Sequence, residues 1–295
     1  IFIMRFFFTF CVVCLLSLNL FLHKLSSKLL CSSVQIKAKG MSGSGIFVSD
    51  SFFVYFITAS HVMAQQIDTL TRLTTDFWYL TTYPDNSIND TPAISTFNAL
   101  KAISDSYLEF HPTQDIAVAI VGRIAPDSSA NGGWVINYPF FSTNRKTVLQ
   151  DWSYYQMRSY NTANIGADVF VFGYPSSIGM KEIPQFDYDR PLLRKGTIAG
   201  RYDTRKSIII DCPVYHGNSG GPVFIIEEQG FDKMVYLVGI ATEYIPVVEE
   251  YKSSSGLFPL NLVSNSGYGV VVSMDYAAEL IRNLRNRHQR ESFVK

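Results

Sequence analysis

The sequence predicts an all-β fold that ends in one α-helix. After about Ser33 the chain consists of short runs rich in Val, Ile, Phe and Tyr, separated by Gly, Asn, Asp, Ser and Pro. This spacing is typical of an all-β sandwich or barrel. Long helical patterns are scarce, and one turn-forming stretch splits the β-rich part into two comparable halves. We therefore expect two β-domains followed by a helix.

Nine apolar runs are the strand candidates, because each is rich in β-branched or aromatic residues and is bounded by turn-forming residues. They are Val34–Ala38, Gly45–Val48, Phe52–Thr58, Ile116–Val121, Val169–Gly173, Ser207–Asp211, Pro222–Ile226, Tyr236–Ala241 and Tyr268–Ser273. The stretch from Gly122 to Gly133 is the predicted linker, because its Pro, Asp, Ser, Asn and Gly residues favour turns. The predicted domains are therefore residues 33–133 and residues 134–295.

The second domain is expected to end in an amphipathic helix at residues 274–287. Ser273 is a suitable N-cap for it. The apolar residues that recur at helical spacing are Ala277, Leu280, Ile281 and Leu284.

Residues 1–32 are predicted to be a targeting segment outside the fold. The run from Phe6 to Leu22 is almost wholly apolar, with Arg5 before it and Lys24 after it, as in a secretory signal. We therefore expect an exported protein, either periplasmic or secreted. The run is short for a spanning helix of about 20 residues but long for a signal core of about 7 to 15. Membrane attachment through an uncleaved anchor at residues 6–22 is the alternative.

The composition excludes a nucleic-acid partner. The 25 basic residues balance the 25 acidic ones, and no Lys/Arg-rich stripe is present. Four cysteines give no visible disulfide framework, although a Cys31–Cys212 bridge stays open. Because the C-x-x-C pair Cys11 and Cys14 lies within the apolar run, we expect no metal and no other cofactor.

The clearest chemical signal is the run His-Gly-Asn-Ser-Gly-Gly-Pro-Val-Phe from His216 to Phe224. Glycines around Ser219 allow sharp turns and leave its hydroxyl open to a substrate. Peptide hydrolysis also needs donors for the developing oxyanion, and the amides of Gly217 and Ser219 are the candidates. Ser219 is therefore the candidate nucleophile.

Two upstream residues are suited to activate that serine. His61 follows the apolar run Phe52–Thr58, and a histidine can take a serine proton and return it to the leaving amine. Asp115 precedes the apolar run Ile116–Val121, where a carboxylate can fix the tautomer of the imidazole.

Four segments together resemble the motifs of bacterial trypsin-like serine proteases. They are Gly-Ser-Gly-Ile-Phe at 43–47, Thr-Ala-Ser-His-Val at 58–62, Asp-Ile-Ala-Val at 115–118 and Gly-Asn-Ser-Gly-Gly-Pro-Val at 217–223. His61, Asp115 and Ser219 follow one another in the chymotrypsin order, and the resemblance spans about residues 43–287. It implies two antiparallel six-stranded β-barrels with the triad in the cleft between them. It also implies a serine endopeptidase that acts on proteins or peptides through a covalent acyl-enzyme.

The departures from the animal digestive enzymes bear on activation and specificity. Asn218 stands where those enzymes carry the aspartate that binds a new N-terminus, so the oxyanion site is expected to form without that salt bridge. The resemblance assigns the substrate pocket to Pro213, His216, Ile240, Thr242 and Gly269. Because Pro213 stands where trypsin keeps its aspartate, cleavage after a small or apolar residue is favoured.

Two other functions compete with this hypothesis. An α/β-hydrolase also carries G-x-S-x-G, but its acid and histidine follow the serine, and here the only later histidine is His288 in a charged tail. The second rival is a catalytically silent protease-fold module that only binds protein segments. The intact triad argues against it.

Overall fold

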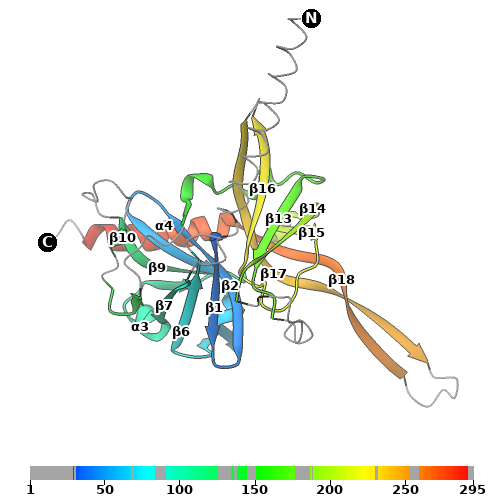
Figure 1. Cartoon of the computed structure of the whole chain (residues 1–295), viewed down its shortest axis with the longest axis horizontal. Coiled ribbons are helices and arrows are strands. Elements are labelled where there is room, and N and C mark those ends of the chain that lie inside the picture. Colours follow the sequence, from blue (N-terminus) through cyan, green and yellow to red (C-terminus); the bar gives the residue numbers. More distant parts are fainter. Residues whose placement is uncertain are drawn as a thin grey trace, which may run out of the picture.

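The computed structural model describes residues 29, 31–67, 70–83, 91–124, 134–135, 138–144, 151–176, 187, 189–229, 232–252 and 259–291. They form two large β-sheets, which occupy the two halves of the chain, and a long C-terminal helix (Figure 1). The apolar run at residues 6–22 lies outside these ranges. Of the helices within them, none is sufficiently long and apolar to cross a membrane.

The N-terminal half is a ten-stranded sheet with the order β10-β9-β3-β2-β1-β6-β7-β11, to which β12 is added beside β2 and β8 beside β9. All its pairs are antiparallel except β12 with β2. Its strands are β1 (Ser33–Ala38), β2 (Met41–Ser49), β3 (Phe53–Thr58), β6 (Phe77–Thr82), β7 (Ala93–Asn98), β8 (Leu108–Phe110), β9 (Ala117–Ile124), β10 (Trp134–Val135), β11 (Phe141–Thr143) and β12 (Trp152–Ser153).

The C-terminal half is a closed, antiparallel barrel with the strand order β13-β14-β15-β18-β17-β16. Its strands are β13 (Asp168–Gly173), β14 (Leu192–Tyr202), β15 (Ser207–Asp211), β16 (Pro222–Gln229), β17 (Asp232–Lys252) and β18 (Pro259–Ser273). The last two are much longer than the others, and their outer ends project from the barrel as a two-stranded ribbon, drawn in orange (Figure 1).

Short elements connect these sheets. They are α2 (Ser60–Met63), the hairpin of β4 (Ala64–Ile67) and β5 (Leu70–Leu73), α3 (Ala99–Ser104), and the 3-10 turns η1 (Tyr154–Gln156), η2 (Tyr160–Thr162) and η4 (Asp203–Arg205). The helix α4 (Met274–Glu291) completes the described chain.

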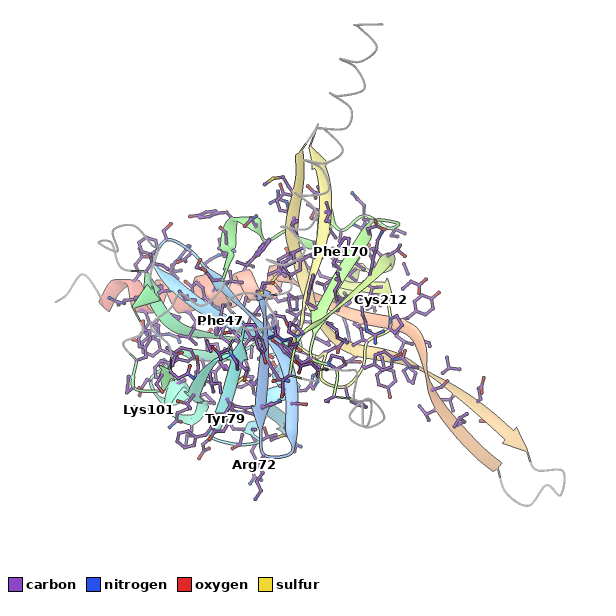
Figure 2. All side chains as sticks on the ribbon, viewed as in Figure 1. Phe47, Arg72, Tyr79, Lys101, Phe170 and Cys212 are labelled. Atoms are coloured by element: carbon purple, nitrogen blue, oxygen red, sulfur yellow. The ribbon has the colours of Figure 1, made fainter. Side chains whose placement is uncertain are left out.

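Burial explains which runs of sequence become which strands. All six side chains of β3 are buried, which is why this strand is a continuous apolar run. β6 and β7 instead alternate buried and exposed residues, as expected for strands with one face on the core. Side chains fill the interior of both halves, with Phe47 labelled in the first and Cys212 in the second (Figure 2).

The helix α4 follows the C-terminal barrel but packs on the N-terminal sheet. Ser273 caps it, since its hydroxyl accepts the amide of Asp275 at 3.3 Å. Leu280, Ile281 and Leu284 are buried in the same core cluster as β3 and β9. α4 therefore fastens the two halves together.

The predicted fold class is confirmed, and all nine predicted strands and the C-terminal helix are present. Two details differ. The C-terminal barrel has the six strands that were predicted, whereas the N-terminal sheet has ten described strands because short edge strands enlarge it. The predicted linker at 122–133 begins inside β9, and the strand that follows it, β10, pairs with β9 in the same sheet. The chain therefore passes from the N-terminal sheet to the C-terminal barrel later, between Ser153 and Asp168. Turn-forming composition marks a connection between paired strands as well as a domain linker.

Cys31 and Cys212 are both buried thiols and form no disulfide.

Candidate active site

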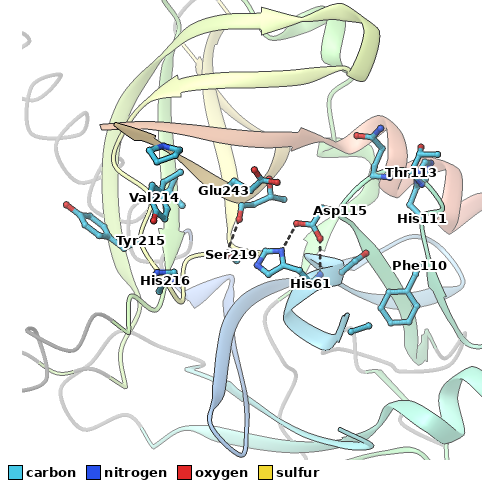
Figure 3. A pocket seen from close by; sticks show the side chains of 16 residues that line it. His61, Phe110, His111, Thr113, Asp115, Val214, Tyr215, His216, Ser219 and Glu243 are labelled. Carbon is cyan, nitrogen blue, oxygen red and sulfur yellow. Dashed lines mark hydrogen bonds and ion pairs between the residues drawn. The ribbon is translucent and has the colours of Figure 1, made fainter. Parts of the chain in front are cut away.

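Three separate elements bring His61, Asp115 and Ser219 to one cavity (Figure 3). His61 is the second residue of α2, directly after β3, and Asp115 ends the turn that leads into β9. Strands β3 and β9 pair with each other, with Thr58 opposite Ala117. This pairing places His61 beside Asp115. Ser219 comes from the other half, in the loop between β15 and β16.

Asp115 holds His61 by two hydrogen bonds (Figure 3). Its Oδ1 accepts the backbone amide of His61 at 2.9 Å, and its Oδ2 accepts Nδ1–H of the ring at 2.6 Å. This fixes the tautomer with Nε2 unprotonated, which is the state a general base requires. Burial alone lowers the pKa of His61, but the hydrogen bond and charge of Asp115, together with the Glu243 charge, raise that pKa above its usual value.

The loop around Ser219 depends on two glycines with left-handed backbone. Gly217 has φ +93°, and a Cβ there would lie 2.2 Å from the carbonyl oxygen of Tyr174. Gly220 has φ +83°, and its Cβ would lie 2.1 Å from the carbonyl oxygen of Ser44. Any larger residue would clash at both positions. The loop shape therefore requires the glycines of the sequence motif.

The amides of Gly217 and Ser219 are available as donors. The intervening amide of Asn218 is donated to Tyr215 O at 2.9 Å, whereas those of Gly217 and Ser219 meet no acceptor among the described residues. The carbonyl of His216 points away, accepting the amide of Ser176 at 2.7 Å. Both amides predicted for the oxyanion site are therefore free to donate to a bound group.

The hydroxyl of Ser219 donates to the carbonyl oxygen of Thr242 at 3.1 Å. No hydrogen bond joins it to His61 within the described residues. In structures without substrate, catalytic hydrogen bonds are often long or unmade.

Ser44 connects the serine loop to the N-terminal sheet, a role that was not predicted and whose only sign in the sequence is the Gly-Ser-Gly context of this residue. The hydroxyl of Ser44 donates to Gly217 O at 2.7 Å and accepts the amide of Tyr174 at 3.0 Å. Its backbone amide donates to Ser219 O at 2.8 Å. Ser44 is fully buried, so it holds the backbone on both sides of Asn218 in place.

The cavity has a volume of about 750 Å³. Of the five residues assigned to the substrate pocket, His216 and Thr242 line it, whereas Pro213, Ile240 and Gly269 do not. Ile240 is fully buried in the core, and Gly269 lies behind the wall residue Val214, since a Cβ on it would lie 2.4 Å from Val214 Cγ2.

One wall of the cavity was not predicted from the sequence. It is the segment before Asp115, and its lining residues are Phe110, His111, Thr113 and Gln114. Its closeness in sequence to Asp115 was the available signal. Among the described residues, the lining also includes Glu243 and contains no Lys or Arg.

Within the described ranges, no group of three or more His, Cys, Asp or Glu side chains is arranged to hold a metal ion.

Comparison with known proteins identifies the family. The family model of the trypsin-like peptidase domain matches residues 43–230. Among solved structures, the serine endoprotease from Yersinia pestis is 17% identical with a TM-score of 0.45, and the match covers 86% of this chain and 63% of that one. The HtrA-type protease AlgW with tripeptide is 16% identical with a TM-score of 0.48, covering 86% and 60%. The inactive form of the Rv3671c protease is 16% identical with a TM-score of 0.42, covering 87% and 90%.

This chain thus spans about three fifths of the length of the first two solved structures. No curated protein matches it. The family match covers well over half of the chain and includes His61, Asp115 and Ser219. The chain therefore belongs to the trypsin-like peptidase domain family.

Proposed function

We propose that the chain is a serine endopeptidase with a triad of His61, Asp115 and Ser219. His61 Nε2 takes the hydroxyl proton of Ser219 while Oγ attacks the scissile carbonyl carbon. The amides of Gly217 and Ser219 stabilise the oxyanion that forms. His61 then gives the proton to the leaving amine as the C–N bond breaks, which leaves an ester on Ser219. Water, deprotonated by His61, hydrolyses the ester and frees Ser219.

The observation that carries this proposal is the pair of hydrogen bonds that Asp115 accepts from His61 in the cavity that also holds Ser219. A bidentate carboxylate fixes both the position and the tautomer of the imidazole. A histidine with a purely structural role needs neither this tautomer nor a neighbouring serine among glycines.

We propose proteins or peptides as substrates, taken in the cavity beside Ser219. His216 and Thr242 line this cavity, which supports their place in the predicted substrate pocket. The preference for a small or apolar residue before the scissile bond stays a prediction from Pro213. Export to the periplasm or the exterior stays a prediction from the N-terminal sequence.

A catalytically silent binding module is the second candidate, and one observation favours it. The Ser219 hydroxyl is donated to Thr242 O and not to His61. If that rotamer is fixed, the cavity binds peptides without cleaving them.

Treatment with a fluorophosphonate distinguishes the two candidates, because only an activated serine reacts at an appreciable rate. We expect mass spectrometry to find the adduct on Ser219 in the unaltered protein and to find none in Ser219→Ala or His61→Ala. Ser104→Ala, which changes an exposed serine on α3, serves as the matched control and should label normally. An unreactive Ser219 in folded protein would establish the silent module.

A further inference from the structure

His111 is a buried histidine that the triad mechanism does not use. Its side chain is 6% exposed, forms part of the cavity lining and faces α4. The ring nitrogen Nδ1 accepts two backbone amides, from Thr113 at 3.3 Å and Gln114 at 3.0 Å. Pro112, which lies between His111 and Thr113, has no amide hydrogen to offer. The ring thus closes a tight turn in the way an aspartate or asparagine side chain commonly does.

These contacts define the protonation state of the ring. Two N–H donors aimed at Nδ1 require a lone pair there, so the neutral ring carries its proton on Nε2. Nε2 lies 3.8 Å from Oε2 of Glu279 on α4, and the ring meets that of Tyr276 edge-on at 4.8 Å. The neutral tautomer therefore suits both its turn and its helix neighbours.

The turn that His111 closes ends on the catalytic carboxylate. The amide of His111 donates to Ile116 O at 2.9 Å, so the turn is pinned at both ends around Asp115. Asp115 directly follows Gln114, one of the two residues held by the ring. Any change in this turn moves the carboxylate that orients His61.

We infer that His111 is a positioning residue whose neutral ring holds the 111–116 turn in the shape that places Asp115 against His61, and that protonation of the ring releases this turn. The catalytic consequence rests on the proposed function, whereas the placement of Asp115 does not. A proton on Nδ1 would face the two backbone amides, so the charged ring cannot keep these hydrogen bonds.

The charged and titratable groups around His111 set the direction of its titration. Glu279 and Tyr276 face it from α4, Asp115 lies in its own turn, and His61 and Glu243 share the cavity lining. Burial lowers the pKa of His111, and the Glu279 carboxylate offsets only part of that effect. The pKa of His61 is raised instead. On acidification His61 therefore protonates first and His111 second.

Two substitutions distinguish the role of His111 as a hydrogen-bond acceptor from the effect of protonating its ring. His111→Asn keeps an acceptor at the same position, because Oδ1 of asparagine replaces Nδ1, but it does not titrate in this range. His111→Leu removes the acceptor. We expect His111→Leu to lower kcat for a peptide substrate about 10- to 100-fold with little change in KM, as for a catalytic group displaced by about 1 Å. His111→Asn should stay within about threefold of the unaltered protein.

The pH profile tests the titration. With two acid-side ionisations, the slope of log kcat/KM against pH should steepen toward about two in the unaltered protein, and it should stay near one in His111→Asn. Val169→Ala, which weakens the separate core cluster of the C-terminal barrel, controls for general destabilisation and should keep the steeper slope. If the slope in His111→Asn equals that in the unaltered protein, protonation of His111 does not contribute to the acid-side loss of activity. If His111→Asn folds but is inactive, the acceptor role of His111 is wrong.

A readout independent of catalysis separates this inference from the proposed function. The low-field proton resonance of the His61–Asp115 hydrogen bond, identified by its loss in His61→Ala, should shift or disappear in His111→Leu and persist in His111→Asn. If the unaltered protein does not react with a fluorophosphonate but this pattern appears, the proposed function fails and the positioning role stands. The same resonance in all three proteins would overturn the role. If His111→Leu does not fold, the pH dependence of the resonance in His111→Asn decides.

Discussion

At the scale of single residues, the site depends on side chains that hold other groups in place. Ser44 illustrates this, because its hydroxyl and its amide together make three hydrogen bonds to Gly217, Tyr174 and Ser219. None of these residues is near Ser44 in the sequence. The loop of the candidate nucleophile Ser219, in one half, is thereby held by a strand of the other half.

Ser44→Ala should therefore weaken both the fold and the site. The substitution leaves a buried carbonyl and a buried amide without a partner, which costs about 1 to 3 kcal/mol. We expect that loss in the free energy of urea unfolding, together with slower fluorophosphonate labelling of Ser219. Ser42→Ala on the same strand β2 is the matched control, since Ser42 is only half-buried and its hydroxyl makes no hydrogen bond among the described residues. Equal effects of the two changes would contradict the role of Ser44.

The carboxylate of Glu243 should influence the pH dependence of the reaction. Burial lowers the pKa of His61, while the Asp115 and Glu243 charges raise it. Removing the Glu243 charge therefore lowers that pKa, so His61 stays neutral and active to a lower pH. We expect the acid limb of the kcat/KM profile to move to lower pH in Glu243→Gln, and not in Glu227→Gln, which alters a strand of the same barrel outside the cavity lining. A shift to higher pH would contradict this.

At the scale of elements, β17 and β18 have two different roles. Their inner parts belong to the closed barrel, and Pro246 at the base of the ribbon lines the cavity. Asn265, opposite Pro246, donates from Nδ2 to Val214 O at 2.7 Å and so supports the cavity wall. Farther out, Val248 and Val263 pair across the ribbon and are 56% and 57% exposed. The outer ribbon thus adds little burial to the barrel.

Shortening the ribbon should therefore leave the barrel intact. Residues 249–262 can be replaced by Asn-Gly, which favours a two-residue hairpin turn between Val248 and Val263. Because an isolated two-stranded hairpin is only marginally stable, we expect the thermal midpoint to change by no more than about 4 °C. Circular dichroism and the rate of Ser219 labelling measure the outcome. Loss of cooperative unfolding in the shortened chain would show that the outer ribbon is part of the stable core.

At the scale of the whole molecule, α4 makes the two halves interdependent. It begins directly after β18, and its apolar face lies in the core of the N-terminal sheet. Polar contacts also join α4 to the N-terminal half, since Arg287 forms an ion pair with Glu109 and His288 is hydrogen-bonded to Ser106 O. Because residues of both halves line the cavity, its shape depends on the position of one half relative to the other.

Leu284→Ala should accordingly destabilise both halves together. Leu284 is fully buried, and truncation of such a leucine costs about 2 to 5 kcal/mol. We expect one cooperative urea transition, shifted to lower concentration, with secondary structure and Ser219 labelling lost together. The neighbouring exposed residue provides the control, because Asn283→Ala should change stability by less than about 0.5 kcal/mol. Two separate transitions would show that the halves unfold independently.

The fold class and the residues of the candidate triad could be predicted from local patterns in the sequence. Strands such as β3 and β9 are continuous apolar runs, and the glycines at 217 and 220 are required by local backbone geometry. Such signals are local, so they can be read without knowing what lies nearby. The order of the motifs then indicated the family.

Contacts between distant parts of the chain determine which weakly apolar segments become strands and which residues line the cavity. β14 alternates exposed and half-buried residues and carries Arg and Lys, so it becomes a strand through pairing with β13 and β15. Likewise, the turn before Asp115 reaches the cavity because β9 pairs with β3, while Ile240 is withdrawn into the core. These outcomes depend on contacts between distant residues, which no local pattern of sequence records.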